Sequence, residues 1–322
     1  MTIPFLMLPP QSDKTRDWGR RLAADHSELE VIVAETREGA EQAMPLAEGA
    51  YGTIPPDLLP KAQKLRWLQA PQAAPPAGYY YPELIAHPVQ ITNFREIYND
   101  HIGAHVMAFV LAFARGFQTY LPQQQRREWK KLPNDTGVVH LPEATLLLVG
   151  VGGIGSEVAR LAAGFGIRVV GVDARRQDKP SGVAELHRPD RLDDLLPQAD
   201  FVVLTVPHTP ETEGFMHRDR FRRMKRSAFF INIGRGMTTR LDDLAAALKD
   251  GEIAGAGLDV YEREPLPADH PLWTMPGVLL TPHTAGYGPY LDDRRFEVLS
   301  DNCRRFAAGQ PLRNLVDKSR WF

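Results

Sequence analysis

The sequence has almost no cysteine and lacks any long apolar segment. Its single cysteine, Cys303, excludes an internal disulfide framework and suits a reducing compartment. No run approaches the roughly 18 apolar residues that a membrane-spanning helix requires. Residues 1–14 lack the basic segment and the small-residue cleavage site of a signal peptide, so we expect a first strand there. These absences predict a cytoplasmic protein with no membrane partner.

The sequence also lacks an excess of charge of either sign. The 38 Lys and Arg residues nearly balance the 40 Asp and Glu residues, which leaves a net charge of -2. A protein that binds nucleic acid through phosphates needs a basic surface, so we expect no nucleic-acid partner. A small ligand is the better expectation for a chain of this composition.

The chain is long for one hydrophobic core, and its length favours two domains. In residues 1–100, short apolar runs alternate with polar or helical stretches, which predicts a first α/β unit. From residue 145 onward the strand-like runs are apolar throughout, as is typical of parallel strands covered by helices on both faces. Between these regions, the segment that starts at residue 101 is apolar on nearly all faces and predicts a buried helix between the two domains.

A glycine-rich turn, GVGGIG at residues 150–155, follows the strand-like TLLLV and opens a helical segment. This context gives the pattern its meaning as a dinucleotide site. Gly150 permits the tight turn, Gly152 lets the backbone approach a pyrophosphate, and Gly155 lets helix and strand pack closely. The N-terminus of the helix would face the anion.

Asp173 follows the next strand-like run, where a carboxylate can accept hydrogen bonds from the adenosine ribose. Its charge would repel the additional phosphate of NADP. Arg175 and Arg176 act in the opposite direction, because a guanidinium there could hold that phosphate. We expect NAD, with NADP as the alternative.

Three ionisable side chains, Arg235, Glu264 and His283, each follow a strand-like run. An open parallel sheet gathers its ligand contacts outside the carboxyl ends of its strands. Histidine can donate or accept a proton near neutral pH, and a neighbouring carboxylate favours its charged form. Arginine can bind a substrate carboxylate through two N–H groups. Together they suffice to bind a carboxylate substrate and to move a proton on it. With a dinucleotide as the hydride donor, they would serve reduction of a 2-oxo acid, with proton transfer by His283, tuning by Glu264 and carboxylate binding by Arg235.

After residue 288 a helical segment lacks a following strand, so we expect it to return to the first domain. The predicted fold is α/β, with two Rossmann-like or flavodoxin-like lobes built on parallel sheets. The cofactor-binding domain is inserted in a discontinuous substrate domain. The predicted bounds are 1–102 and 289–322 for the substrate domain and 103–288 for the NAD-binding Rossmann domain.

From about residue 145 to 290, the chain resembles the D-isomer-specific 2-hydroxyacid dehydrogenase family. The segments that carry the resemblance occur in the same order as in the family, and they are GVGGIG, LTVPHTPET, FFINIGRG, LAAALKDGEIAGAGLDVYEREPLP and HPLWTMPGVLLTPHTAG. The spacing of Arg235, Glu264 and His283 is also similar to that of the family's catalytic arginine, glutamate and histidine. The resemblance implies that these three residues are catalytic.

The resemblance also implies a set of cofactor contacts, among which Asp259 would lie near the nicotinamide carboxamide. The expected contacts are Gly150, Gly152, Gly153, Ile154, Asp173, Arg175, Thr205, Val206, Pro207, Thr212, Ile233, Gly234, Arg235, Asp259, His283 and Gly286.

The N-terminal part departs from the family. Relatives commonly carry a turn similar to Gly-Ala-Gly-Val-Asp, whose amides hold the substrate carboxylate, where this chain has APQAAPP at residues 70–76. Proline donates no amide hydrogen. We therefore expect substrate contacts from Gln72, Ala73 and Ala74, beside Arg235 and His283.

Two smaller features allow more than one interpretation. The run Tyr79-Tyr80-Tyr81 either forms a wall against a bulkier substrate or serves packing or an oligomer contact. His101 and His105 lie one helical turn apart, a spacing that could hold a metal or serve a structural or interface role. We expect no metal site, because no third ligand other than Asp100 is apparent.

The family implies an NAD(P)-dependent oxidoreductase that interconverts a 2-oxo acid and a D-2-hydroxy acid, with glyoxylate or hydroxypyruvate as first candidates. It also implies a homodimer, with the apolar helix from residue 101 as a contact. Two alternatives are a dinucleotide-sensing, corepressor-like binding protein and a formate dehydrogenase. Relatives of the latter type carry glutamine at the position of Glu264.

Overall fold

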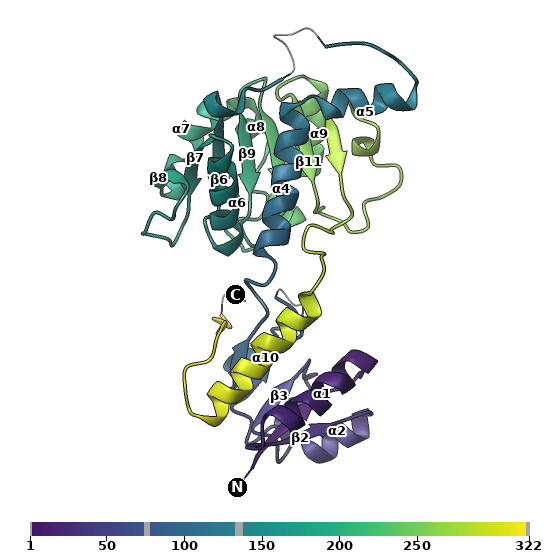
Figure 1. Ribbon diagram of the computed structural model, residues 1–322, viewed down its shortest axis with the longest axis vertical. Coiled ribbons are helices and arrows are strands. Elements are labelled where there is room, and N and C mark those ends of the chain that lie inside the picture. Colours follow the sequence, from purple (N-terminus) through teal and green to yellow (C-terminus); the bar gives the residue numbers. More distant parts are fainter. Residues whose placement is uncertain (1, 74–77, 133–137, 320–322) are drawn as a thin grey trace. The chain divides into compact units, whose positions relative to one another are not determined.

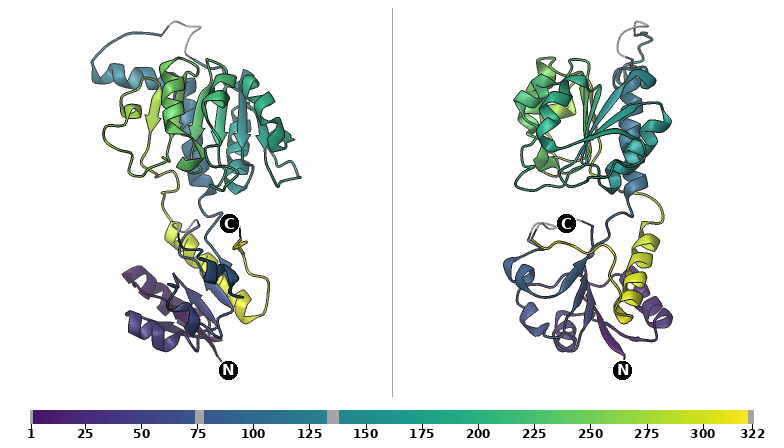
Figure 2. Two further views of the ribbon diagram at one scale, coloured as in Figure 1. Left: turned by 180° about the vertical axis from the view of Figure 1, so that it is seen from behind. Right: turned by 90° about the vertical axis from the view of Figure 1, so that its left-hand side faces the viewer.

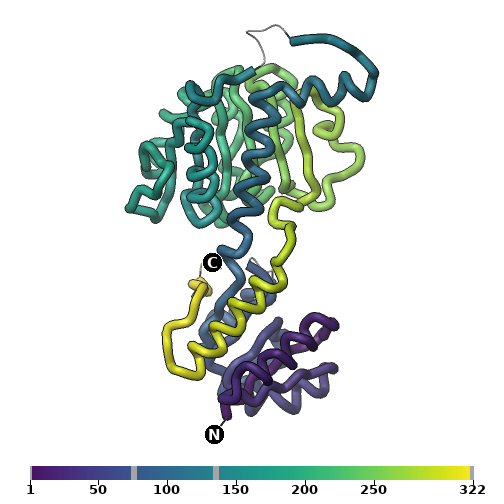
Figure 3. The backbone as a smooth tube through the Cα atoms, in the orientation of Figure 1, coloured from purple at the N-terminus to yellow at the C-terminus, as the bar shows by residue number. Residues whose placement is uncertain are grey.

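A computed structural model describes residues 2–73, 78–132 and 138–319. The chain forms two compact units: unit 1 contains residues 1–97 and 289–322, and unit 2 contains residues 98–288. Unit 1 is therefore discontinuous in sequence, as the chain path in Figures 1 and 3 shows. Unit 2 begins at Tyr98 rather than at residue 103, because Asn99 already starts the helix α4 (Asn99–Ala114).

Within its described residues, unit 1 contains a five-stranded parallel sheet of order β2-β1-β3-β4-β5. Rings from Phe5, Trp67 and Phe306 pack together on the face that the C-terminal helix covers. The strands are β1 (Ile3–Met7), β2 (Leu29–Val33), β3 (Gly49–Tyr51), β4 (Trp67–Gln69) and β5 (Gln90–Thr92). The helices are α1 (Asp13–Asp25), α2 (Arg37–Ala43), α3 (Pro82–Ala86) and α10 (Leu291–Ala307).

The described part of unit 2 contains a seven-stranded parallel sheet of order β12-β11-β10-β9-β6-β7-β8. Its strands are β6 (Thr145–Val149), β7 (Arg168–Val172), β8 (Val183–His187), β9 (Phe201–Leu204), β10 (Phe229–Asn232), β11 (Gly255–Leu258) and β12 (Val278–Leu280). Its helices are α4, α5 (Phe117–Gln125), α6 (Gly153–Gly164), α7 (Leu192–Leu195), α8 (Arg218–Arg223) and α9 (Leu241–Lys249). Short 3₁₀ turns lie at Leu59–Lys61, Leu141–Glu143, Pro189–Arg191, Leu196–Gln198, Gly236–Thr238 and Pro271–Trp273.

Helices cover both faces of the unit 2 sheet, with α4 and α6 on one face and α8 and α9 on the other (Figure 2). Alternate residues of β6 show the division. Leu146 and Leu148 belong to the cluster that contains residues of α4 and α6. Leu147 and Val149 belong to the cluster that contains residues of α7, α8 and α9. Because both faces are buried, the strand is apolar at nearly every position.

Two local predictions from the sequence were wrong or incomplete. The apolar segment from residue 101 does not form one helix, because α4 ends at Ala114 and a separate helix, α5, starts at Phe117. Gly116 between them has a φ of 73°, which a continuous helix cannot contain. Strand β8 was not recognised, because its residues are partly exposed at a sheet edge and it lacks the apolar run of a buried strand.

The fold class predicted from the sequence is confirmed: both units are α/β and both sheets are parallel. Cys303 is buried within α10, and this burial, together with the charge of Glu28, raises the pKa of its thiol. None of the described helices is long and apolar enough to cross a membrane.

Candidate active site

The carboxyl ends of the strands in unit 2 all lie at one edge of the sheet. From β6 the chain adds β7 and β8 on one side, and then β9 to β12 on the other. The order therefore reverses between β6 and β9, and ligands of open α/β sheets bind outside the strand ends at such a switch point. The predicted cofactor and catalytic residues follow the carboxyl ends of β6, β7, β9, β10, β11 and β12.

The glycine-rich turn after β6 has the geometry of a site for an anionic group. Gly150 has a φ of 93°, and a Cβ added to Gly155 would lie 2.2 Å from the Gly150 carbonyl oxygen. A Cβ added to Gly152, in contrast, would meet nothing within 4 Å. Gly152 is the N-cap of α6, where unpaired backbone N–H groups favour an anion. The turn is thus closely packed inside and accessible at the position from which a pyrophosphate would approach.

Asp173, directly after β7, is bonded to the glycine turn. Its Oδ2 accepts from the Val151 N–H at 2.7 Å, and its Oδ1 accepts from the N–H groups of Arg175 and Arg176 at 2.7 and 2.8 Å. Burial acts to raise the pKa of this carboxyl, but these N–H groups and the charge of Arg175 bring the pKa below its ordinary value. A carboxylate has about four acceptor sites, so one remains for a ribose hydroxyl.

The Arg176 side chain also binds the glycine turn and the start of α6. Its guanidinium donates to the Val151 carbonyl oxygen at 2.9 Å, to Ser156 Oγ at 2.7 Å and to Asp178 Oδ2 at 2.9 Å. The side chain is therefore committed to the protein. The backbone N–H of Arg175, the other arginine that sequence reasoning considered for a phosphate, donates to Asp173 Oδ1.

Arg235 lies in a backbone segment that passes very close to its neighbours. A Cβ added to Gly236 would lie 1.8 Å from the Tyr261 carbonyl oxygen, which explains the glycine there. The buried Asn232 side chain donates to the Arg235 carbonyl oxygen at 3.2 Å, and Arg235 itself donates to the Gly234 carbonyl oxygen at 2.6 Å. Burial lowers the pKa of the Arg235 guanidinium, while the charge of Glu264 opposes this shift. Arginine remains charged at neutral pH.

Glu264 and His283 are in direct contact, although they follow different strands. His283 Nδ1 lies 2.6 Å from Glu264 Oε2, and Glu264 Oε1 accepts from the Tyr261 N–H at 3.0 Å. His283 has a φ of 53°, in the left-handed region that non-glycine residues rarely adopt. Such strain persists where the surroundings over-determine it and is concentrated at functional sites. Its ring is half exposed, with 48% of the side chain accessible.

Asp259 is buried and holds the loop that carries His283. Its Oδ1 accepts from Thr281 Oγ1 at 2.6 Å and from the Thr284 N–H at 2.8 Å, and its Oδ2 accepts from the Ala285 N–H at 2.8 Å. The carboxylate therefore fixes the backbone on both sides of His283. Sequence reasoning placed Asp259 beside the nicotinamide and did not foresee this contact.

The remaining predicted contacts of unit 2 lie in the turns after β9, β10 and β12. Thr205 Oγ1 donates to the Gly150 carbonyl oxygen at 2.6 Å, which ties the β9 end to the glycine turn. Thr212 Oγ1 donates to the Pro207 carbonyl oxygen at 2.7 Å and stabilises the following loop. The other predicted contacts after these strands are Val206, Ile233, Gly234 and Gly286, whereas Gly153 and Ile154 lie in the first turn of α6, after β6.

The predicted substrate loop lies in unit 1, after β4. Gln72 is exposed, and the Ala73 carbonyl oxygen accepts from Asn93 Nδ2 at 2.9 Å. Ala74 lies outside the described residues. The tyrosines anchor the end of the loop: Tyr79 donates to the Gly52 carbonyl oxygen and Tyr81 to the Ile54 carbonyl oxygen, both at 3.0 Å.

Two further residues lie behind the catalytic edge, His105 and Thr281. Sequence reasoning considered His105 only as a metal ligand or as a structural or interface residue, and gave Thr281 no role. Their side chains are joined, with His105 Nε2 3.0 Å from Thr281 Oγ1. Thr281 stands in the TPH motif and could have been noticed there, whereas the contact of His105 with Thr281 had no local signal because the two residues are far apart in the sequence. Among the described residues, no group of three or more His, Cys, Asp and Glu is arranged to hold a metal ion.

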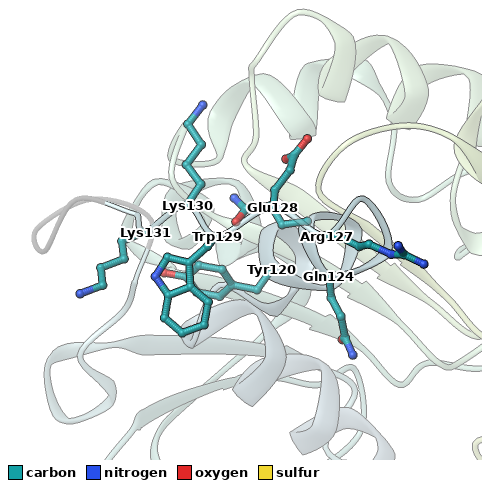
Figure 4. A pocket seen from close by; sticks show the side chains of 8 residues that line it. Tyr120, Gln124, Arg127, Glu128, Trp129, Lys130 and Lys131 are labelled. Carbon is teal, nitrogen blue, oxygen red and sulfur yellow. The ribbon is translucent and has the colours of Figure 1, made fainter.

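A separate pocket of about 520 Å³ lies at α5 and the segment after it (Figure 4). It contains no predicted site residue. Its lining residues are Tyr120, Gln123, Gln124, Arg127, Glu128, Trp129, Lys130 and Lys131.

Comparison with known proteins points to one protein family. Residues 107–285 match the family model described as "D-isomer specific 2-hydroxyacid dehydrogenase, NAD binding domain". A glyoxylate reductase from Thermococcus kodakarensis is 36% identical over 242 residues, which cover 71% of this chain and 70% of that protein. A glyoxylate reductase from Korarchaeum cryptofilum is 42% identical over 175 residues, and the match covers 54% of this chain and only 52% of that protein.

Solved structures extend the similarity to both units. A D-isomer specific 2-hydroxyacid dehydrogenase from Xanthobacter autotrophicus Py2, in complex with NADPH and MES, aligns over 100% of both chains with a TM-score of 0.86 and 29% identity. The matched family domain contains the parallel sheet and the glycine turn of unit 2. The chain belongs to the D-isomer specific 2-hydroxyacid dehydrogenase family, and residues 107–285 are its NAD-binding domain.

Proposed function

We propose that the protein is an NAD(P)-dependent oxidoreductase that interconverts a 2-oxo acid and a D-2-hydroxy acid, with reduction as the working direction. The observation that carries the proposal is the 2.6 Å contact between His283 and Glu264 at the sheet edge that also holds Arg235 and the glycine turn. The site thus combines a proton-transfer group, a fixed cation and a dinucleotide cradle. The relatives named glyoxylate reductase support glyoxylate or hydroxypyruvate as the first substrates.

Each of the three side chains has a distinct role in this proposal. Glu264 accepts the hydrogen bond from His283 Nδ1, so Nε2 is the nitrogen that exchanges a proton with the substrate oxygen. During reduction His283 protonates that oxygen, and during oxidation it removes the proton. Arg235 binds the substrate carboxylate and polarises the carbonyl group. A bound dinucleotide supplies or accepts the hydride.

The residues around the glycine turn fit such a cofactor. The open position at Gly152 admits the pyrophosphate, and Asp173 retains an acceptor site for the ribose. We propose NAD as the preferred form, because the Asp173 carboxylate is fixed where an additional phosphate would be repelled. NADP is the alternative, supported by the NADPH bound to the Xanthobacter protein and by Arg175 nearby.

We assign unit 2 to the cofactor and unit 1 to the substrate. Within unit 1, we propose that Gln72 and Ala73 contact the substrate through their backbone N–H groups, and the third predicted contact, Ala74, lies outside the described residues. Support for this assignment comes from the Asn93 contact, which holds the Ala73 carbonyl oxygen and thereby orients the loop. The tyrosine contacts with Gly52 and Ile54 favour a packing role for the Tyr79–Tyr81 run.

The test is a panel of 2-oxo acids that includes glyoxylate and hydroxypyruvate, assayed with NADH and with NADPH. Formate with NAD is added as the competing oxidation. We expect rapid oxidation of NADH with at least one small 2-oxo acid and no reduction of NAD with formate. Tight dinucleotide binding without turnover of any acid would instead indicate a binding protein and would contradict the proposal.

We further propose a cytoplasmic homodimer. A chain with one cysteine cannot form an internal disulfide, which suits a reducing compartment. Phe117 and Leu121 lie four positions apart on α5 with about half of each side chain accessible, and Trp129 beside the pocket of Figure 4 is 94% exposed. Exposed apolar side chains favour a protein interface when they share one surface, and we propose that these three do so in the dimer. Light scattering after size-exclusion chromatography tests the state, and Trp129→Ala should weaken a dimer formed here.

A further inference from the structure

The N-terminal half of α4 faces the loop that carries His283. His105 lies near this loop with 22% of its side chain accessible, and its Nε2 is 3.0 Å from Thr281 Oγ1. One turn earlier, the ring of His101 lies against Gly288, since a Cβ added to Gly288 would be 2.2 Å from the ring. The segment from Thr281 to Gly288 therefore rests on two histidines of one helix face.

The hydrogen bonds from His105 have a defined direction. An ionised carboxylate only accepts, so the Thr281 hydroxyl must donate to Asp259 Oδ1 at 2.6 Å. The same hydroxyl oxygen then accepts from His105 Nε2–H. Burial lowers the pKa of His105, against the opposing charge of Asp259, and either protonation state can supply this donor when Nε2 carries the proton.

The chain of bonds ends at the backbone beside His283. Asp259 accepts from the N–H groups of Thr284 and Ala285, the two residues that follow His283. His283 has a left-handed φ of 53°, a conformation that requires support from its surroundings. An Asp259 carboxylate held by Thr281 and His105 can provide that support, because it cannot rotate away from the two N–H groups without losing its other bonds.

We propose that His105 is a positioning residue: through Thr281 and Asp259 it holds the loop on which His283 transfers a proton. This inference rests on the proposed function of His283. It predicts that kcat and the protection of the His283 loop depend on the N–H donor of His105 and not on the packing of its ring. A purely structural role predicts the opposite, because the His105 ring also packs edge-on against Phe109, with centroids 4.9 Å apart at 87°.

Two substitutions separate the donor from the ring. His105→Phe keeps an aromatic ring against Phe109 and removes the donor, whereas His105→Gln keeps an N–H donor and removes the ring. For His105→Phe we expect about a tenfold lower kcat, equivalent to about 1.4 kcal/mol, with unchanged KM and unchanged NADH affinity. His105→Gln should retain kcat to within about threefold of the wild type. His140→Gln, at an exposed histidine, is the matched control.

Amide exchange of the dinucleotide-free protein gives a readout that needs no turnover. In His105→Phe, peptides covering Thr281–Gly288 should exchange at least about fivefold faster than in the wild type, while His105→Gln should resemble the wild type. Thr281→Val, which removes the hydroxyl but keeps the shape, should match His105→Phe, and Thr281→Ser should restore protection. The effects of His105→Phe and Thr281→Val should not add, since each breaks the same chain of bonds.

The exchange result stands even if no 2-oxo acid is reduced, so failure of the proposed reaction and failure of this inference are distinguishable. Wild-type exchange in His105→Phe would overturn the inference. So would a His105→Gln variant that is slower in turnover or less protected than His105→Phe, because the ring would then be the important part.

Discussion

In each of the two sheets, a different kind of contact stabilises the loops at the carboxyl ends of the strands. In unit 2, buried or half-buried carboxylates collect backbone N–H groups: Asp173 accepts three and Asp259 accepts two. Hydrogen bonds to a charged group contribute about 1.5–3 kcal/mol each, roughly twice a neutral bond. The edge that contains His283 is therefore fixed by charge.

In unit 1, neutral side chains perform the same task over long sequence separations. Tyr79 donates to the Gly52 carbonyl oxygen, Asn93 to that of Ala73, and Asn314 to that of Asn93. Asn314 belongs to the C-terminal segment, which adds an antiparallel bridge beside β5 at Leu315. The comparison teaches that charge-assisted hydrogen bonds hold the edge of unit 2, whereas weaker neutral hydrogen bonds hold the proposed substrate loop of unit 1.

The largest expected effect comes from removing the proton-transfer group of unit 2. His283→Ala should lower kcat by about a thousandfold, because general acid catalysis contributes about 10²–10⁴ in rate. NADH affinity, measured by fluorescence titration, should not change. His140→Ala is the control at an exposed histidine. A kcat close to that of the wild type would show that His283 is not the acid.

The second expected effect concerns the fixed cation. Arg235→Lys should reduce kcat/KM by about a hundredfold, or about 2.7 kcal/mol, through both a lower kcat and a higher KM. Lysine keeps the charge but cannot bind a carboxylate through two N–H groups. Steady-state kinetics with the best acid of the panel measures it, with Arg226→Lys as the surface control. If KM and kcat both stay normal, Arg235 does not bind the substrate.

A smaller effect is expected from the neutral edge of unit 1. Asn93→Ala removes the donor to the Ala73 carbonyl oxygen, and we expect about a fivefold increase in KM, the equivalent of one neutral hydrogen bond of about 1 kcal/mol. The dissociation constant for NADH should be unchanged, which separates this variant from any in the glycine turn. An unchanged KM in a folded variant would exclude a substrate role for the loop.

The smallest effect separates neighbouring tyrosines of unit 1. Tyr79→Phe leaves the Gly52 carbonyl oxygen without its donor and should lower the free energy of unfolding by about 1 kcal/mol. Tyr80→Phe should change it by less than about 0.5 kcal/mol, since the described residues provide no hydrogen-bond partner for its buried hydroxyl. Urea unfolding of both variants measures the difference. Equal losses would mean that the rings, rather than the hydroxyl groups, hold the loop.

Much of the site in unit 2 could be predicted because its requirements are local. Glycine at residues 150 and 155 follows from a positive φ and a close backbone approach, and both leave a pattern in the sequence. The order of apolar strands and the absence of alternation predicted a parallel sheet with covered faces. The break at Gly116 was not predicted, because apolar residues continue on both sides of it and hide the end of α4.

By itself, the sequence determined the α/β class, the family and the three ionisable residues at strand ends, since each of these depends on a short motif or on periodicity. The tertiary structure decided which of these groups touch and what supports them. Three contacts join separate segments of the chain. His283 contacts Glu264, Asp259 accepts a hydrogen bond from the loop that carries His283, and His105 contacts Thr281. No local pattern encodes such contacts, because they exist only when parallel strands bring their carboxyl ends to one edge.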